Sequence, residues 1–450
     1  MRDHGIDPAR VTALKAREDA RFAREHPRCR ALLERARASM PNGVPMSWMV
    51  SYNDHPPVFV VEGHGARFSC ADGHAFLDTN IGDKSTFCGL DPEPVVRALA
   101  ARAAAGWQFL QPTEDAAEVA EELARRWGRP YWQFTLSATQ ANVEAVRLAR
   151  HATGRDKVLL FAGNYAGHAD ELLVSYGGGG LRAPYLGLAS RSYGDVGLID
   201  YNDVAALERA LATREFACVV SEPALTNVGV VLPDPGFHDA LRALTREHGS
   251  LLLLDETHTL ICGPGGLTRR WGLEPDVVTA GKAIGGGVPL GAYGMTEELA
   301  EVFVAGRGRD GREGELATGG TLFANGLSMA AAKAALTEVL TEQTYTRTAA
   351  LGGRLADGIQ DLARGAELPW AVHRLYARSG WSLCGRLARN AREADEDAWP
   401  EFSALQQVYL ANRGVWEAIS SAGPAVSAAA AAADVDEYLA ALGELVTELV

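Results

Sequence analysis

Short apolar runs alternate with helical patterns through the middle of the chain. Between residues 92 and 340, runs such as 158–161, 218–220 and 251–254 are separated by segments with the apolar spacing of helices. Such runs are typical of buried parallel strands, and their alternation with helices predicts βαβ units. The pattern therefore predicts an α/β fold with a mainly parallel sheet covered by helices.

The N-terminal part of the chain has a different pattern. Residues 7–40 are rich in Ala, Arg, Glu and Leu, and a start at Asp7 followed by proline predicts one or two exposed helices. Short strands are expected at 58–61, 66–69 and 75–78. An Asp-Gly pair before the last of them predicts a hairpin turn.

Three segments near the C-terminus have distinct patterns. Alanine-rich periodicity at 326–340 predicts a long helix. The polar segment 391–401 is expected to form an exposed loop. Residues 435–449 are expected to form a final amphipathic helix, with Asp434 and Glu437 spaced as a capping box.

Composition restricts the partners and the location of the protein. The chain has 450 residues, of which 47% are hydrophobic and 22% charged, and its net charge is −14. This composition is typical of a globular protein, and the acidic charge argues against nucleic acid or an anionic membrane as a main partner. Six scattered cysteines lack the spacing of a metal site, and we find no signal-peptide core and no membrane-length apolar run. We therefore expect a cytoplasmic protein without a metal.

An acid and a lysine follow two of the predicted strands. Asp255 comes directly after the run 251–254, and Lys282 follows a second short predicted strand at 277–279 and lies among glycines. Ligands gather at the carboxyl ends of strands in open α/β sheets, so both side chains are expected at that edge. Pyridoxal phosphate (PLP) needs such a pair, a lysine for a Schiff base and an acid beside the pyridine nitrogen. A surface lysine and an acid that caps a strand are the alternative interpretation.

Further polar stretches suit a cofactor with a phosphate and a ring. Ser137, Ala138 and Thr139 open a helical pattern, where free backbone N–H groups and the helix dipole bind anions. Ordinary N-capping by Ser137 or Thr139 is the alternative. Tyr165 follows an apolar run and would lie flat on a ring, unless it is a packed surface tyrosine. Glu222 also sits just past such a run, with Asn227 shortly after.

These stretches and their order resemble the class III aminotransferases of the fold type I PLP enzymes, in particular the glutamate-1-semialdehyde aminomutase branch. The resemblance extends from about residue 40 to the C-terminus and rests on five motifs, at 165–170, 201–203, 222–229, 281–287 and 320–325. It implies a large PLP-binding domain with a mainly parallel seven-stranded sheet covered by helices, and a smaller α+β domain. The expected division is an N-terminal helical arm with small-domain strands (1–75), the large domain (76–340) and the C-terminal small domain (341–450).

The resemblance also implies PLP as the cofactor and assigns roles to matching residues. Lys282 would form the Schiff base, and Asp255 would pair with the pyridine nitrogen. Tyr165 would stack on the ring, and Asn227 would face the phenolic oxygen. Thr321 would reach the phosphate of the neighbouring subunit, because the family's sites lie at the interface of a homodimer. The residues expected at the cofactor are Ser137, Ala138, Thr139, Tyr165, Glu222, Asn227, Asp255, Thr257, His258, Lys282 and Thr321.

Several positions depart from the family's cofactor-binding motifs. Gln140 stands where the family has an acid, and Ala166 stands where it has histidine. Thr257 replaces an apolar valine, and His258 follows it. Ala138 replaces a glycine, and it still donates its backbone N–H if its φ is negative.

Other departures concern the substrate. Segment 45–49 lacks the arginine that binds the substrate carboxylate in the aminomutases, and segment 81–85 replaces their Gly-Ser-Trp-Gly stretch. Lys84 would replace that arginine as a point charge, unless it is a solvent-facing loop residue. Trp48 and Met49 would add apolar surface for a bulky amino substrate.

The resulting hypothesis is an aminotransferase that moves an amino group from an amine or amino acid to a keto acid or aldehyde by a ping-pong mechanism. Lys282 would then act as the general base. An intramolecular aminomutase is the alternative, for which the four glycines at 177–180 would form a retaining lid rather than an ordinary flexible loop. A non-catalytic homologue that serves binding or assembly is an alternative of another class.

Overall fold

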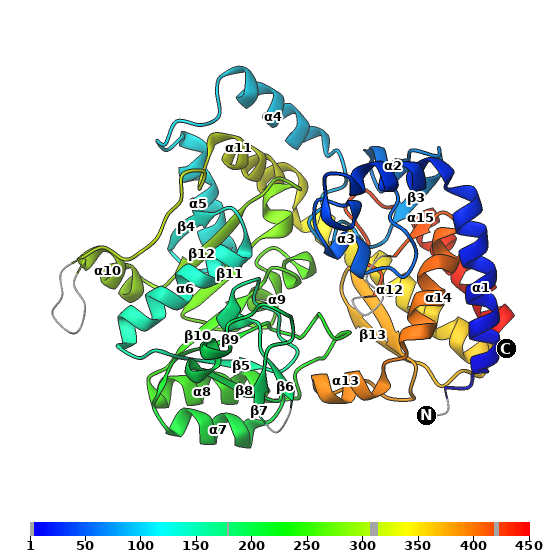
Figure 1. The fold of residues 1–450 in the computed structure, drawn as a ribbon. Coiled ribbons are helices and arrows are strands. Elements are labelled where there is room, and N and C mark those ends of the chain that lie inside the picture. The colour runs from blue at the N-terminus through cyan, green and yellow to red at the C-terminus, as the bar shows by residue number, and fades with distance from the viewer. Residues whose placement is uncertain (1–3, 178–179, 307–313, 418–422) are drawn as a thin grey trace. The chain divides into compact units, whose positions relative to one another are not determined.

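The polypeptide folds into two compact units, shown in a computed structural model (Figure 1). The large unit comprises residues 93–345 and 388–393, and the small unit comprises residues 1–92, 346–387 and 394–450. The structure describes residues 4–177, 180–306, 314–417 and 423–450. The small unit thus combines segments from both ends of the chain.

A seven-stranded sheet forms the centre of the large unit, which confirms the expected fold class. Its strand order is β4 (Tyr131–Thr135), β12 (Gly291–Met295), β11 (Val277–Ala280), β10 (Leu251–Asp255), β9 (Phe216–Ser221), β5 (Lys157–Phe161) and β8 (Val196–Ile199). β12 is antiparallel to both of its neighbours, whereas the remaining neighbours pair in parallel. The carboxyl ends of all strands except β12 therefore meet at one edge, which is the edge where open α/β sheets bind ligands.

Helices cover both faces of this sheet (Figure 1). The helices of the large unit are α4 (Glu93–Ala104), α5 (Glu114–Trp127), α6 (Ala138–Thr153), α7 (Val204–Ala212), α8 (Phe237–His248), α9 (Gly266–Arg270), α10 (Glu297–Ala305) and α11 (Gly326–Ala334). Along β5, Val158 and Leu160 pack in the core with α6, whereas Leu159 and Phe161 pack in the core with α7 and α8. Burial on both faces explains why these strands have continuous apolar sequences.

Of two predictions in the large unit, the helix is largely confirmed, and the lid stays a prediction. The predicted helix at 326–340 is α11, which continues as a π-helical turn over Ala335–Val339. The short strands β6 (Ser175–Gly177) and β7 (Gly180–Arg182) pair antiparallel on either side of the glycine run. Gly178 and Gly179, the middle of the proposed lid, lie outside the described residues.

A four-stranded sheet and a two-stranded hairpin lie in the small unit. The sheet has the order β1 (Val60–His64), β2 (Arg67–Cys70), β3 (Ala75–Asp78) and β15 (Val415–Trp416), and the hairpin is β13 (Ala371–Leu375) with β14 (Arg378–Ser382). The helices that lie wholly or partly in this unit are α1 (Pro8–Glu25), α2 (Pro27–Arg37), α3 (Trp48–Ser51), α12 (Glu342–Gly365), α13 (Ala391–Asp397), α14 (Pro400–Ala411) and α15 (Ala432–Leu449). β15 pairs in parallel with β3, so a C-terminal segment completes the N-terminal sheet.

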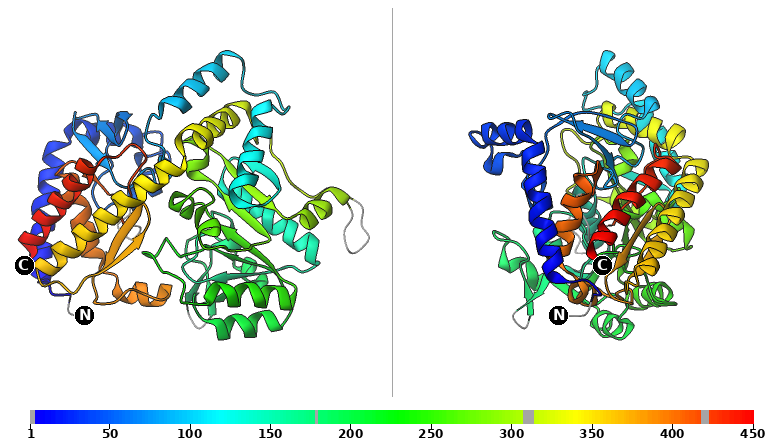
Figure 2. Two further views of the ribbon diagram at one scale, coloured as in Figure 1. Left: turned by 180° about the vertical axis from the view of Figure 1, so that it is seen from behind. Right: turned by 90° about the vertical axis from the view of Figure 1, so that its right-hand side faces the viewer.

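The first helix packs along α14 in the small unit (Figure 2). α1 begins as predicted, because the Asp7 side chain accepts the Ala9 N–H at 2.9 Å and proline occupies the first helical position. The Arg17 guanidinium on α1 forms an ion pair with the Glu448 carboxylate on α15. No helix in the described part of the chain is both long and apolar enough to cross a bilayer.

Of two predictions near the C-terminus, the exposed loop is wrong, and the final helix is confirmed as α15 with a different start and cap. Segment 391–401 is not an exposed loop, because it contains α13 and the start of α14. The side chain of Asn390 accepts the Glu393 N–H at 2.9 Å and caps this helix, a signal hidden by the polar composition. α15 begins three residues earlier than expected, and Asp434 accepts the Ala431 N–H at 2.8 Å instead of pairing with Glu437 in a capping box.

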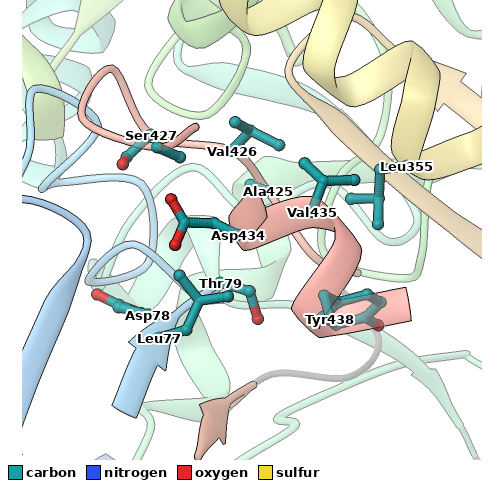
Figure 3. A pocket seen from close by; sticks show the side chains of 11 residues that line it. Leu77, Asp78, Thr79, Leu355, Ala425, Val426, Ser427, Asp434, Val435 and Tyr438 are labelled. Atoms are coloured by element: carbon teal, nitrogen blue, oxygen red, sulfur yellow. The ribbon is translucent and has the colours of Figure 1, made fainter. Parts of the chain in front are cut away.

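A small cavity lies in the core of the small unit (Figure 3). Apolar side chains such as Leu77, Leu355 and Val435 line it, together with Tyr438 from α15. Its volume has room for about one water molecule. The cavity is therefore a packing defect and too small for an amino acid.

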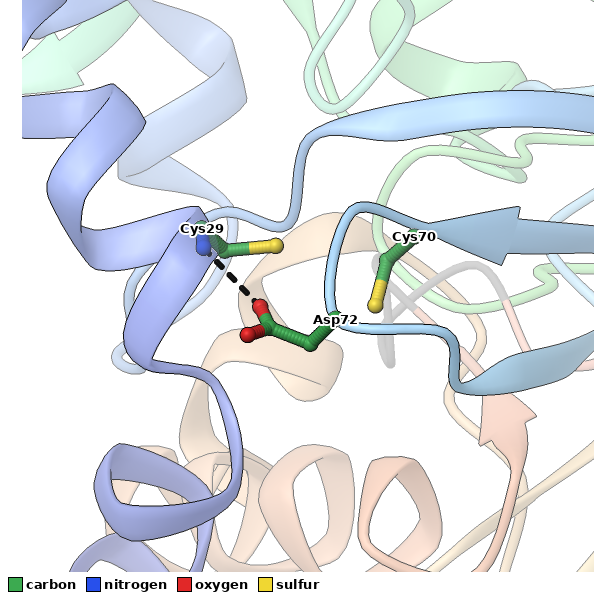
Figure 4. A group of neighbouring side chains, drawn as sticks. All are labelled: Cys29, Cys70 and Asp72. Atoms are coloured by element: carbon green, nitrogen blue, oxygen red, sulfur yellow. Dashed lines mark hydrogen bonds between the residues drawn. The ribbon is translucent and has the colours of Figure 1, made fainter.

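Two cysteines and an acid meet at the start of α2 (Figure 4). The possible ligand atoms of Cys29, Cys70 and Asp72 lie within 4.8 Å of one another. The Asp72 carboxylate accepts the N–H groups of Arg28 and Cys29 at 2.7 and 2.9 Å, so it caps the helix. Burial raises the pKa of Cys29 to about 12, which keeps the thiol protonated. Helix capping and packing account for this cluster.

Candidate active site

Polar side chains of the large unit gather at the carboxyl ends of its parallel strands. Asp255 is the last residue of β10 and pairs in register with Thr279 of the neighbouring β11. The Glu256 N–H also bonds to the Thr279 carbonyl at 2.8 Å. Lys282 follows three residues after Thr279, so the strand register places the acid and the lysine at the ends of adjacent strands.

Asp255 is buried and held by neutral donors. Its carboxylate accepts the Thr257 N–H at 2.8 Å and the Asn142 side-chain amide at 2.6 Å. Asn142 also donates to the Ala166 carbonyl and accepts the Thr279 hydroxyl. Burial raises the pKa of Asp255, and its hydrogen bonds and Lys282 oppose that shift. The carboxylate is thus fixed in position but would still gain from a cationic partner.

Asn142 was missed by the sequence analysis. It lies on α6 and is fully buried, on a helix whose buried face is otherwise mostly alanine, valine and leucine. A buried amide on such a face needs a polar partner, and here the partner is the Asp255 carboxylate. That mismatch between polarity and position is the signal that would have identified it.

Lys282 opens a short 3₁₀ turn, Lys282–Gly285, after β11. Its φ of 51° lies in the left-handed region, which is costly for a residue other than glycine and is common at functional sites. The side chain is half-buried, and its Nζ lies 2.5 Å from Nε2 of His258. A ring nitrogen of His258 is therefore within hydrogen-bond distance of the lysine amine.

The start of α6 is surrounded by close backbone. Ser137 caps this helix, and the first N–H groups of an α-helix have no carbonyl partner within the helix. A Cβ on Gly281 would lie 2.9 Å from Ala138 Cβ, one on Gly167 would lie 2.6 Å from Thr139 Oγ1, and one on Gly291 would overlap Ser137. These glycines allow three chain segments to approach the helix start, which forms a cradle for an anion.

Two departures from the family's motif fit this cradle. Ala138 lies in the helix with negative φ, so its N–H points as that of a glycine would. The Gln140 side-chain oxygen accepts the Leu136 N–H at 3.1 Å. The amide thus provides an acceptor at the position where the family has an acid.

Glu222 organises the segment after β9. One carboxylate oxygen accepts the Tyr165 N–H at 3.1 Å and the Asn227 amide at 3.4 Å, and the other accepts the Thr226 hydroxyl. The same hydroxyl lies 2.7 Å from Nδ1 of His258. Burial raises the pKa of Glu222 to about 7. Thr226, which the sequence analysis also missed, therefore connects this acid to the histidine beside Lys282.

Lys84, proposed to bind the substrate, lies in the small unit among acids. It is fully buried, so the solvent-facing alternative is wrong. Its Nζ lies 3.4 Å from the Asp83 carboxylate. Burial raises the pKa of Asp78 to about 6 and that of Glu417 to about 7, and the charge of Lys84 opposes both shifts. Lys84 thus neutralises carboxylates of its own unit, and its contact with substrate stays a prediction.

The other expected site residues, Trp48, Met49 and Thr321, do not follow strands of the seven-stranded sheet. Trp48 and Met49 lie on the short helix α3 of the small unit, where Trp48 is half-buried and Met49 is exposed. Thr321 lies in the large unit, in the loop before α11, and its side chain is exposed. The Gln108 side chain bonds to the Thr321 carbonyl at 2.5 Å. The roles of these three residues stay predictions.

The residues at this edge fit PLP. The start of α6 suits a phosphate, because its first backbone N–H groups have no carbonyl partner within the helix. Gly281 and Gly291 let neighbouring chain segments pack closely around this helix start, since a side chain at either position would clash with it. Asp255 is a buried carboxylate whose pKa is raised by burial, so a protonated ring nitrogen beside it would stabilise its charge. Lys282 would supply the amine that PLP enzymes require.

Comparisons with known proteins identify the family. The sequence profile described as aminotransferase class-III matches residues 49–380. Glutamate-1-semialdehyde 2,1-aminomutase of Desulfitobacterium hafniense is 34% identical over 361 residues, which are 78% of this chain and 82% of the relative.

Two solved structures are also similar. The glutamate-1-semialdehyde-aminomutase of Pseudomonas aeruginosa is 37% identical, with a TM-score of 0.93 over 99% of this chain and all of that one. A lysine-to-alanine variant of the same protein was solved in complex with PMP. An omega-transaminase of Sphaerobacter thermophilus is 28% identical, with a TM-score of 0.86 over 94% of this chain and 97% of that one.

The sheet and these similarities define an α/β enzyme of PLP fold type I. The chain belongs to the class III aminotransferase family, and its cofactor is PLP. The expected family, fold class and cofactor are thereby confirmed.

Proposed function

We propose that this protein moves amino groups with PLP and that Lys282 is the residue to which the cofactor attaches. The observation that carries the proposal is the placement of Asp255 and Lys282 at the ends of adjacent strands, next to the glycine-lined start of α6. When bound, PLP withdraws electrons from the substrate carbon and accepts the amino group. The residues of the chain then have to hold the cofactor, orient it and move protons.

Each residue at this edge has a role in the proposal. Asp255 would keep the ring nitrogen protonated, and Asn142 would fix the orientation of that carboxylate. After the amino substrate displaces it, the amine of Lys282 would act as the general base at the substrate carbon. Backbone N–H groups at the start of α6 would bind the phosphate. Tyr165 would stack on the ring, and Asn227 would face its phenolic oxygen.

Two candidates remain for the overall reaction. An intramolecular aminomutase is favoured by the relatives, because the similar proteins at 34% and 37% identity carry the name glutamate-1-semialdehyde aminomutase. The aminotransferase favoured by the sequence analysis is supported at the level of the family. Both reactions use the same groups at the cofactor, so they differ in whether the substrate is retained or exchanged.

The substrate-binding departures favour the aminotransferase. Segment 45–49 has no arginine for a carboxylate, and the one lysine of segment 81–85 lies among Asp78, Asp83 and Glu417. A buried carboxylate of a substrate needs a cationic or multiple N–H partner. We therefore propose an amine or amino acid with a sizeable apolar group as the amino donor, and a keto acid or aldehyde as the acceptor.

One experiment distinguishes the two candidates. The purified protein with PLP would be given glutamate-1-semialdehyde alone, and in parallel a panel of amines and keto acids. Formation of 5-aminolevulinate without a second substrate would support the aminomutase and overturn the aminotransferase proposal. Exchange of the amino group between separate donor and acceptor would support the aminotransferase. The Lys282→Ala variant serves as the control for non-enzymatic conversion, and no conversion in any assay would support a non-catalytic homologue.

We also propose that the active form is a homodimer in which Thr321 contacts the phosphate bound by the partner. The exposed position of Thr321 in the loop before α11 agrees with this role. Co-expression of Lys282→Ala and Thr321→Glu chains tests it, because a mixed dimer would contain one site with both native residues. Each variant alone should be inactive, and the mixture should regain part of the activity. An active monomer in light scattering, or no recovery in the mixture, would contradict the proposal.

A further inference from the structure

Two side chains, His258 and Thr226, connect Lys282 to a buried acid, Glu222, in the large unit. Nζ of Lys282 lies 2.5 Å from Nε2 of His258, and Nδ1 of His258 lies 2.7 Å from the Thr226 hydroxyl. The Thr226 hydroxyl donates to one oxygen of Glu222. His258, Thr226 and Glu222 are all buried, so water competes little for these bonds.

The direction of each hydrogen bond follows from the number of protons available. A hydroxyl has one proton, and Thr226 uses it on Glu222, so Thr226 can only accept from His258. His258 therefore carries its proton on Nδ1 when Glu222 is ionised, and its Nε2 lone pair faces the amine of Lys282. The histidine is thus oriented to accept a proton from the lysine.

We propose that His258, Thr226 and Glu222 form a relay that removes a proton from the ammonium group of Lys282. In this step Lys282 transfers one proton to Nε2 of His258, and Nδ1 releases its proton to the Thr226 oxygen. The Thr226 hydroxyl passes its own proton to Glu222. The products are a neutral lysine amine, a neutral histidine of the other tautomer, an intact hydroxyl and a protonated Glu222. The inference rests on the proposed function, because a neutral amine is the form of Lys282 that attacks PLP.

The surroundings of the relay support this direction of proton transfer. Burial raises the pKa of Glu222 to about 7, and the nearby charge of Asp255 contributes to this shift. A carboxylate with such a pKa takes up a proton near neutral pH, as a base matched to that pH requires. The other oxygen of Glu222 is held by Tyr165 and Asn227, so the relay oxygen keeps its orientation.

The other acids beside His258 have partners of their own. Asp255 accepts bonds from Asn142 and from the Thr257 N–H. The neighbouring Glu256 accepts the Thr259 hydroxyl and the Thr268 N–H. Glu222 is the acid that this series of hydrogen bonds connects to Lys282 through His258 and Thr226.

Substitution of Thr226 tests the relay without changing its two end groups. Thr226→Val removes the hydroxyl and keeps the shape of the side chain, whereas Thr226→Ser keeps the hydroxyl. Protein freed of cofactor would be mixed with PLP across a range of pH, and the rate of attachment followed by absorbance. We expect Thr226→Val to attach PLP about tenfold more slowly near neutral pH, with its pH midpoint about one unit higher. Thr226→Ser should behave like the wild type.

The outcomes separate the relay from the proposed function. Borohydride reduction and peptide mapping establish that PLP attaches to Lys282 in each protein, and circular dichroism establishes that the variants fold. If the wild-type protein does not attach PLP at Lys282, the proposed function fails. If it does, and Thr226→Val has the same pH profile as Thr226→Ser, the relay is overturned while the function stands. If Thr226→Val does not fold, Glu222→Gln is compared with the wild type and should show the same upward shift, and an unshifted profile overturns the relay.

Discussion

Each unit has a lysine close to carboxylates, but the two lysines have different partners. In the small unit, Lys84 is fully buried, and its charge opposes the effect of burial on Asp78 and Glu417. Glu417 also accepts bonds from Gln406 at 2.9 Å and Tyr438 at 2.6 Å. Every charge of this group thus has a nearby partner within the same unit, as expected of a group that stabilises a fold.

In the large unit, the acid and the lysine each form hydrogen bonds with neutral groups. Asp255 is held by the Asn142 amide and a backbone N–H, whereas Lys282 faces a nitrogen of His258. Because the donors to Asp255 are neutral, its carboxylate can still stabilise a cation. The ring nitrogen of His258 can accept a proton from Lys282. The two groups thus differ in the partners of their charges: the small unit places its lysine among carboxylates, whereas the candidate site places a carboxylate among neutral donors and an amine beside a ring nitrogen.

The segments that carry the two lysines are both strained. Ile81, Gly82, Asp83 and Lys84 have φ values of 48°, 54°, 51° and 73°, a run of four residues in the left-handed region. The Asp78 carboxylate accepts the N–H groups of Ile81 and Gly82 at 2.7 and 3.2 Å, which stabilises this run. Strain alone therefore does not identify the active site, because both lysines have it.

Loss of Lys282 should have the largest effect. Lys282→Ala should abolish turnover and the borohydride-reducible link to PLP, because it removes the amine that lies just after β11. The fold should persist, since the side chain is half-buried and the neighbouring histidine keeps its bond to Thr226. The matched control is Lys84→Met, which should keep the link to PLP. Near-normal turnover of Lys282→Ala would contradict the assignment.

Asp255→Asn should have the next largest effect, on chemistry rather than on folding. The amide keeps the size of the side chain but cannot hold the ring nitrogen in its protonated form. We expect a loss of about 10²-fold or more in kcat, because an oriented electrostatic partner typically contributes several kcal/mol. Steady-state kinetics at saturating PLP measure this loss. A decrease of less than about tenfold, with cofactor bound, would argue against the pairing.

Lys84→Met should affect stability instead of chemistry. Removing the lysine leaves the carboxylates of Asp78 and Glu417 buried without their cation, so we expect a loss of about 3 kcal/mol at about pH 8. The loss should be smaller at about pH 5, where both acids are protonated. Urea unfolding at the two pH values measures it. An unchanged stability together with an altered KM for acidic substrates would instead show that Lys84 acts at the substrate.

Glu417→Gln should have the smallest effect, seen in the dependence of stability on pH. Burial raises the pKa of Glu417 to about 7 in the folded protein, from an ordinary value of 4.5. The folded state therefore binds more protons than the unfolded state between these values, so the free energy of unfolding falls as pH rises through this window. Glutamine does not titrate, so the variant should lack this decline, which is at most about 3 kcal/mol for a shift of this size. Identical declines in both proteins would disprove the shift.

The strands, and the positions of Asp255 and Lys282 at their ends, could be predicted from the sequence. Residues 251–254 are buried on both faces of the sheet, so their apolar run and the acid that ends it are visible locally. Asn142 and Thr226 could not be found in this way, because their roles depend on which side chains α6 and the segment after β9 bring next to them.

The partners of Lys84 were also invisible in the sequence. Glu417 and Tyr438 come from the far end of the chain, and β15 brings that end next to β3. Helix α13 was missed for a similar reason, since Asn390 caps it and Arg392 pairs with Asp200 of a distant segment. Local polarity favoured a loop there, and contacts distant in sequence decided the outcome.

The attachment site of PLP is the most direct test of the account. The protein would be loaded with PLP, reduced with borohydride, digested and mapped by mass spectrometry, with Lys282→Ala and Lys84→Met treated in parallel. The account predicts one pyridoxyl group on Lys282 in the wild type and in Lys84→Met, and none in Lys282→Ala. A pyridoxyl group on another lysine of the wild type, or its retention in Lys282→Ala, would contradict the account.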